Sequence, residues 1–310
     1  MRTTIHHRRA RSCGEPRWDT RKVTMYEGLG QLLEDAAAKV DVWTGHDLWT
    51  FETGSPAAIE VANAEVRLDG SPWGDRPVRT AYQLGQMATK FTVEMARCMA
   101  PLVRSARPAP GVEALTRTSL EAASVVWWLF ELGLTARQRV CRMQLLRRNS
   151  AKELEAAIAA VGGDPSVGTR DTVAAVEAYG DELGLQPFGQ KGNELEGEVR
   201  PGYTARVKRF TDDVGYQGSY NLYSGVAHAE LAGLWRLMQQ TGTLADGAPI
   251  YDAGPDPRAT HSAVQGALKA MMGSMERIVF LLGWTAPGRS EEVGAWIDHV
   301  NDELARLKEW

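Results

Sequence analysis

Apolar residues recur every three or four positions along most of the chain from Val78 onward, and alternating runs rich in β-branched residues are nearly absent. Spacing of three and four places apolar side chains on one face of an α-helix, whereas alternation is typical of a half-buried strand. Together with the proline and glycine clusters between the periodic stretches, the pattern predicts helices near 24–40, 78–106, 112–133, 135–160, 168–184, 203–212, 216–240, 258–284 and 288–309. The expected fold is mainly α, a helical bundle with an irregular N-terminal segment.

The chain contains no internal repeat and no linker long enough to separate two domains. Residues 1–23 are basic and lack the apolar stretch of a secretory signal, which predicts a disordered basic arm. We expect 24–310 to form a single α-helical domain, in which 24–77 are an irregular subregion and 78–310 are the bundle.

Two connections, 186–201 and 241–257, are longer than helix packing requires, and they flank the predicted 216–240 helix. Long loops without structure of their own are usually functional lids or solvated spacers. The sequence leaves both interpretations open.

Composition restricts the function classes. The 310 residues carry a net charge of −4, with 44% hydrophobic and 24% charged residues. This charge argues against a protein whose whole surface binds nucleic acid, and only a local basic patch could do so. No apolar run reaches the length of about 18 residues that a membrane span needs. Cys13, Cys98 and Cys141 are far apart and form no CxxC or Cys/His cluster, which indicates neither zinc nor a disulfide framework. We expect a cytoplasmic protein that does not cross a membrane.

The segment 216–235, YQGSYNLYSGVAHAELAGLW, separates into faces when it is placed on a helix at about 100° per residue. Tyrosines and leucines fall on one side and small residues on the other, which predicts a helix buried between neighbours. Ser224, His228 and Trp235 share the margin between these faces, and we take this edge as the candidate site.

The candidate catalytic residues are His228, Ser224 and Tyr220. His228 is suited to acid/base work or hydrogen bonding, helped by Tyr220 or Tyr223. A serine-hydrolase mechanism is disfavoured, because two groups on one helix seldom meet nucleophile–base geometry and the chain has no GxSxG segment. A structural alternative, in which His228 is a hydrogen-bonded core residue, stays open.

The 112–133 helix carries a narrow polar stripe of Arg117, Glu121, Ser124, Trp128 and Glu131. The stripe is either a solvent-facing edge with an Arg117–Glu121 pair, or it turns inward onto the His228 edge, where Glu121 would fix Arg117 for binding an anion. Under the second interpretation the candidate ligand-binding residues are Arg117, Glu121, Trp128, Tyr223, Trp235 and Arg142.

The helix after it has arginines spread around its circumference, namely Arg137, Arg139, Arg142, Arg147 and Arg148. A solvated charge run would segregate to one face. These arginines therefore either meet an anion such as a ligand phosphate or RNA backbone, or pair with the chain's own acids, such as Glu131, Glu153 and Glu155.

The combination Arg117-x3-Glu121-x5-Trp-Trp, an arginine-rich helix, and Tyr-x2-Tyr-Ser-x3-His228 resembles a group of uncharacterised bacterial helical proteins. Over about 78–240 it is also distantly similar to the HEPN helical-bundle superfamily. That resemblance implies a bundle, RNA cleavage or nucleotide handling, and leaves a homodimer open. The chain departs from the superfamily's Arg-x4-6-His motif, because 222–227 before His228 contain no arginine.

A second resemblance is to the magnesium-binding pair of class I terpene cyclases, carried by Asp212-Asp213 and, near the C-terminus, by Asn301-Asp302 and Glu309. It departs from that family because the first motif lacks its third acid and Ala305 replaces the hydroxyl residue of the second. It would imply a magnesium-dependent lyase acting on a prenyl diphosphate, with Asp212 and Asp213 as metal ligands.

No Glu-x-x-His pair and no phosphate-cradling glycine loop occurs in the chain. We therefore expect no cofactor, with magnesium only under the lyase alternative. The favoured function is binding of a small anionic ligand, a nucleotide or RNA, in a polar pocket between helices, with metal-free acid/base chemistry by His228. The alternatives are the lyase and a non-catalytic interaction protein, and whether the protein is an enzyme stays open.

Overall fold

The computed structural model describes residues 20–44, 50–62, 71–106, 110–164, 172–216, 220–228, 238–244, 247–253, 256–283 and 289–308. Within these ranges helices dominate, and the strands form two small antiparallel sheets of two strands each. The predicted mainly α fold is confirmed. None of the helices in these ranges combines the length and the apolar content that crossing a membrane requires.

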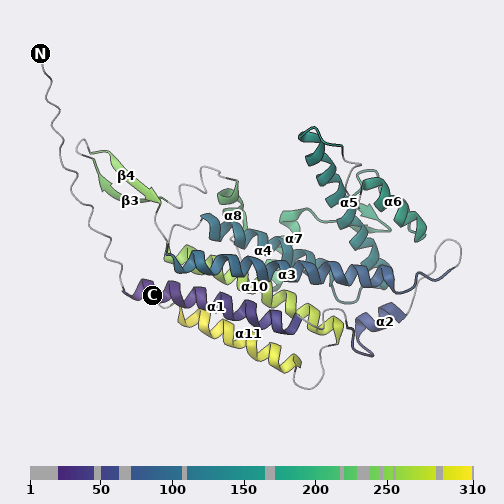
Figure 1. Cartoon of the computed structure of the whole chain (residues 1–310), viewed down its shortest axis with the longest axis horizontal. Coiled ribbons are helices and arrows are strands. Elements are labelled where there is room, and N and C mark those ends of the chain that lie inside the picture. Colours follow the sequence, from purple (N-terminus) through teal and green to yellow (C-terminus); the bar gives the residue numbers. More distant parts are fainter. Residues whose placement is uncertain are drawn as a thin grey trace, which may run out of the picture.

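Five helices lie side by side as the body of the bundle (Figure 1). They are α1 (Thr20–Thr44), α3 (Arg76–Arg104), α4 (Pro110–Leu129), α10 (Pro257–Leu282) and α11 (Arg289–Arg306). α3 packs against α1, α4 and α10, and its contacting residues are buried together with theirs in one continuous core. The short α2 (Pro56–Ala62) contacts α10 and α3.

A second group of elements is attached along α4 and beyond its end (Figure 1). It contains α5 (Ala136–Ala160), α6 (Val173–Glu182), β1 (Glu194–Leu195), β2 (Glu198–Val199), α7 (Tyr203–Asp213) and α8 (Tyr220–Ala227). α7 and α8 both pack on α4, while β1 and β2 pack on α5. The polar stripe of α4 is therefore enclosed by neighbours instead of facing solvent.

Local sequence explains where several helices begin and end. Thr135 opens α5 with a capping box, in which its hydroxyl accepts from the Gln138 backbone N–H while the Gln138 side chain accepts from the Thr135 N–H. Asp256 caps α10 through the Arg258 backbone N–H, and Gly283 ends that helix in the left-handed region at φ 76°.

The predicted helix over 216–240 is wrong in its extent. α8 covers Tyr220–Ala227, and β3 occupies Met238–Thr243, paired antiparallel with β4 at Pro249–Ala253. Threonine and glycine in β3 are weak helix formers, and Gly247 at φ 87° supplies the turn that reverses the chain. The 241–257 connection thus contains a strand, as 186–201 contains β1 and β2.

Three smaller differences concern the first third of the chain. α1 begins at Thr20, so the last residues assigned to the basic arm are helical, and α1 continues to Thr44 as a regular core helix. α2 was not predicted, since seven residues are too few to show a period. α3 begins at Arg76 and ends at Arg104, two residues from either end of the predicted 78–106 helix, and it contains Pro101.

The contact between α3 and α4 depends on a glycine. A Cβ added at Gly85 would overlap the ring of Phe130. We expect Gly85→Ala to lower the free energy of unfolding by about 1–3 kcal/mol through overpacking. Gly294→Ala in α11 is the matched control: its Cβ meets nothing within 4 Å, so the better helix propensity of alanine should raise stability by about 0.5–1 kcal/mol. Urea unfolding measures both, and equal stabilities of the two variants would contradict this packing.

Candidate functional site

Four of the predicted site residues meet where α4 and α8 pack together. The Arg117 Nε donates to Glu121 Oε1 at 2.9 Å, and the Tyr220 hydroxyl donates to the same oxygen at 2.7 Å. The Arg117 Nη1 lies 2.8 Å from His228 Nε2. Arginine can only donate, so His228 Nε2 is the acceptor and the proton of the neutral ring is on Nδ1. We call Arg117, Glu121, Tyr220 and His228 the His228 cluster.

The electrostatics of this cluster favour hydrogen-bond donation by Tyr220 over ionisation. Burial raises the pKa of the Tyr220 hydroxyl, and its hydrogen bond to Glu121 raises it further. The Arg117 guanidinium also lies 5.8 Å from the centre of the Tyr220 ring. Tyr220 therefore stays protonated at neutral pH. His228 is exposed, so its ring is accessible from solvent.

The other predicted residues of the His228 edge lie elsewhere. The Tyr223 side chain is fully buried, and its hydroxyl contacts Tyr216 Oη at 2.7 Å and Ser262 Oγ at 3.2 Å, facing α10 and not the cluster. Ser224 is partly buried one turn before His228, and the His228 backbone N–H donates to the Ser224 carbonyl oxygen. Trp235 lies outside the described residues.

A pocket of about 230 Å³ opens next to the cluster, between α4, α5, β2 and α7. It is lined by Ser124, Trp127, Trp128, Arg142, Glu198, Val199, Pro201, Ala205, Arg206 and Arg209. We call it the Arg206 pocket. Two of its lining residues, Trp128 and Arg142, belong to the predicted ligand-binding set.

Arg206 is the unusual residue of this pocket. It is 4% exposed, and its Nε donates to Ser124 Oγ at 2.9 Å. Its guanidinium also lies 5.2 Å from the centre of the Tyr203 ring. Among the described residues no carboxylate forms an ion pair with it. Burial lowers the pKa of Arg206, and the charge of nearby Arg200 lowers it further.

A buried charge without a partner is costly, since several kcal/mol of hydration are lost and little is recovered. The hydroxyl of Ser124 is only a partial substitute, because it is neutral and its own proton is donated to Glu121 O at 2.6 Å. The Nη1 and Nη2 groups of Arg206 can therefore donate hydrogen bonds to an anion inside the pocket.

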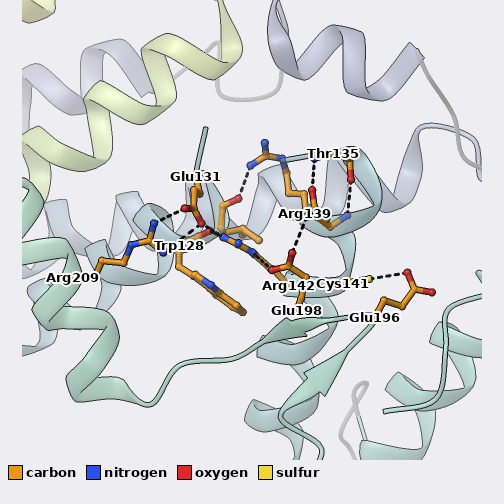
Figure 2. A network of polar contacts seen from close by, with 11 residues as sticks. Trp128, Glu131, Thr135, Arg139, Cys141, Arg142, Glu196, Glu198 and Arg209 are labelled. Carbon is orange, nitrogen blue, oxygen red and sulfur yellow. Dashed lines mark hydrogen bonds and ion pairs between the residues drawn. The ribbon is translucent and has the colours of Figure 1, made fainter. Parts of the chain in front are cut away.

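The other two arginines of the pocket share one acid (Figure 2). Glu131 accepts from Arg142 Nη1 at 2.5 Å and also from Arg209 Nη2. Arg142 donates in addition to Glu198 Oε2 at 2.6 Å and to Trp128 O at 2.7 Å. Although burial opposes it, hydrogen bonds from Arg209 and Arg142 hold the pKa of Glu131 below its ordinary value.

The arginines of α5 mostly pair with the chain's own acids, which is one of the two predicted interpretations. Arg137 pairs with Glu196, Arg139 with Glu60, Arg142 with Glu131 and Glu198, and Arg148 with Glu177. Of the three acids expected as partners, only Glu131 has this role. Glu153 instead accepts from Asn149 and Tyr203, and Glu155 accepts from the Val173 backbone N–H.

Two indoles form a wall of the pocket, and each already has a cation against one face. The Arg277 guanidinium lies 3.7 Å from the centre of the Trp127 ring, and that of Arg142 lies 5.2 Å from Trp128. Both tryptophans are buried, and the Trp127 Nε1 donates to Asp213 Oδ2 at 2.6 Å.

The lyase alternative requires Asp212 and Asp213 to bind magnesium, but both carboxylates have protein partners. Asp213 accepts from Trp127, and Asp212 forms an exposed ion pair with Lys208 one turn earlier. Across the described residues, no group of three or more histidine, cysteine, aspartate or glutamate side chains is placed to hold a metal ion.

Arg206, Arg209 and Trp127 were not among the predicted site residues. A signal for Arg206 exists in the sequence of α7, YTARVKRFTDD, where Arg206 and Phe210 are four residues apart and share one face. Both are buried, so an arginine on the apolar face of an amphipathic helix marked this position.

Comparison of the chain with protein-family models, with curated proteins and with solved structures finds no match.

Proposed function

We propose that this cytoplasmic protein binds an anionic ligand, a nucleotide or RNA, in the Arg206 pocket. The observation that carries the proposal is Arg206 itself, a guanidinium that is almost fully buried, borders a pocket and has no ion-pair partner among the described residues. Nucleotides and RNA supply the phosphate oxygens that guanidinium groups bind best.

The His228 cluster is the second part of the proposed site. Arg117, Glu121 and Ser124 follow one another along α4 at spacings of four and three, so the cluster and the pocket share one face of this helix. Ser124 Oγ connects them directly, since it accepts from Arg206 Nε and donates to Glu121 O. In this proposal His228 exchanges a proton with the bound ligand, and no metal takes part. Arg117 positions the His228 ring, and Arg117 and Tyr220 together position Glu121.

Thermal unfolding against a ligand panel tests the proposal. We expect a nucleotide, short RNA or inorganic phosphate to raise the Tm of the wild-type protein, because a ligand that binds only the folded state stabilises it by about 2.7 kcal/mol at one hundred times its Kd. Arg206→Met should lose this shift. Arg306→Met is the matched control, since Arg306 is exposed and pairs with Glu303 on the same helix.

The stability of Arg206→Met without ligand shows whether Arg206 binds a ligand or stabilises the fold. Replacing a buried unpaired charge by an apolar side chain should leave stability unchanged or raise it. A clear loss of stability, or the same ligand shift in both variants, would show that Arg206 serves the fold, and absence of any shift in the wild type would remove the proposal.

A further inference from the structure

We infer that the Arg206 pocket accepts one terminal phosphate group, so that the ligand is a phosphomonoester such as a mononucleotide and not an RNA chain. This inference rests on the proposed function and specifies the ligand of the same site. Size, charge and the state of the two indoles support it independently.

The size of the pocket limits what can enter it. Its volume of about 230 Å³ is smaller than the 300–1,000 Å³ that is typical of sites enclosing a drug-sized ligand. A whole nucleotide is about as large as such a ligand. A tetrahedral head group fits such a space, and the remainder of the ligand must lie outside it. Arg206 is then the inner contact, because its terminal nitrogens have no described acceptor while its Nε is fixed by Ser124.

The local charge matches a doubly charged group. The charged residues that line the pocket or contact its lining are Arg142, Arg200, Arg206, Arg209 and Arg277, and Glu131, Glu198 and Asp213, so five positive and three negative charges leave +2 there. Glu121 does not alter this balance, because Arg117 neutralises it. A phosphomonoester carries about −1.5 to −2 at pH 7, whereas each phosphodiester of an RNA chain carries a single charge.

The indoles argue against recognition of single-stranded RNA. Such recognition depends on exposed aromatic faces on which successive bases stack. Here Trp127 and Trp128 are 8% and 5% exposed, and guanidinium groups of Arg277 and Arg142 already lie against them. The indoles line the pocket with apolar surface, and a lower local dielectric strengthens the attraction between Arg206 and a phosphate.

Isothermal titration of the full chain tests the inference with inorganic phosphate, adenosine monophosphate, adenosine, and a short RNA that has no terminal phosphate. We expect the first two to bind and the last two not to bind. Binding of adenosine monophosphate should strengthen between pH 5.5 and 7.5, as the phosphate loses its second proton with a pKa of about 6.

Variants locate the binding. Arg206→Met should weaken binding of adenosine monophosphate by at least about tenfold, as expected for loss of a charge-assisted hydrogen bond. Arg209→Met, at the exposed rim, should weaken it severalfold, and Arg306→Met should leave it unchanged. Ser124→Ala should weaken binding while the pH dependence stays as in the wild type, because Ser124 acts through Arg206 as a positioning residue.

The outcomes separate the two proposals. If the RNA without a terminal phosphate binds and Arg206→Met abolishes its binding, the site binds anions but the phosphomonoester inference is wrong. If adenosine monophosphate binds equally well in Arg206→Met, the phosphate site lies elsewhere and the inference fails. If none of the four compounds binds, the inference and the proposed function fall together.

Discussion

Replacing Arg139 by methionine should lower the free energy of unfolding by about 3–5 kcal/mol, the cost of removing one partner from a buried ion pair. Arg139 is fully buried, and its Nε and Nη2 each donate to Glu60 at 2.7 Å. Its third donor satisfies the carbonyl of Leu129 at the end of α4, and its guanidinium lies 4.9 Å from the centre of the Tyr82 ring. The variant leaves both Glu60 and this carbonyl without their donor.

Urea unfolding of the single and double variants tests the cause of this loss. Adding Glu60→Leu to Arg139→Met should restore about half of the stability or more, since the uncompensated carboxylate is then removed. Arg306→Met, which breaks an exposed pair on α11, should change stability by less than about 1 kcal/mol. If the double variant is no more stable than Arg139→Met, the loss comes from packing against Tyr82 and not from the ion pair.

Long periodic stretches allowed most of the fold to be predicted from the sequence. α3, α4 and α10 repeat their buried positions along nearly their whole length of 20 residues or more, so a single unusual residue does not hide the helical period. The prediction of one helix over 216–240 failed because the described parts of this segment include the short α8 and the first residues of β3, whose sequence continues the same periodic pattern. The tyrosines and Met238 fit a helical face over that length, and nothing local shows that the chain pairs with Pro249–Ala253 instead.

The candidate site was predictable where it depends on one helix and not where it depends on distant partners. The Arg117–Glu121 spacing and the position of His228 at a helix margin were visible in sequence, and the structure brings the three side chains together. Their roles in binding and catalysis stay predictions, as does that of Trp235. Glu60, Glu196 and Glu198 are contributed by segments far from α5 in the chain, so no spacing rule reveals that they neutralise its arginines.

Because acids from distant segments neutralise most arginines, the number of arginines in a segment does not show that Arg206 lacks an acidic partner. Arg206 and Arg209 are three residues apart in α7 and look equivalent in a charge tally. Their faces of α7 separate them, since Arg206 is buried against α4 on the same face as Phe210, whereas Arg209 is exposed and pairs with Glu131. The functional assignment therefore depends on which arginine lacks an acid in the folded state.

Glu131→Gln should weaken the fold and strengthen phosphate binding at the same time. The neutral amide cannot replace the charge-assisted bonds to Arg142 and Arg209, so we expect a loss of about 1–3 kcal/mol in the free energy of unfolding. Removing one negative charge beside the Arg206 pocket also removes a competitor for both arginines. Binding of adenosine monophosphate should become about tenfold tighter, or about 1.4 kcal/mol.

The dependence of stability on pH provides a separate check on Glu131. Its pKa in the folded protein is lowered from 4.5, so its contribution is complete above about pH 4.5 and is lost as the pH falls through the folded-state pKa. The stability difference between wild type and Glu131→Gln should therefore shrink below pH 4.5. Glu303→Gln, which breaks an exposed pair on α11, is the control and should alter neither stability nor binding by a measurable amount. A destabilised Glu131→Gln that binds phosphate no more tightly than the wild type would mean that Arg142 and Arg209 do not take part in binding, and would leave Arg206 as the sole arginine of the site.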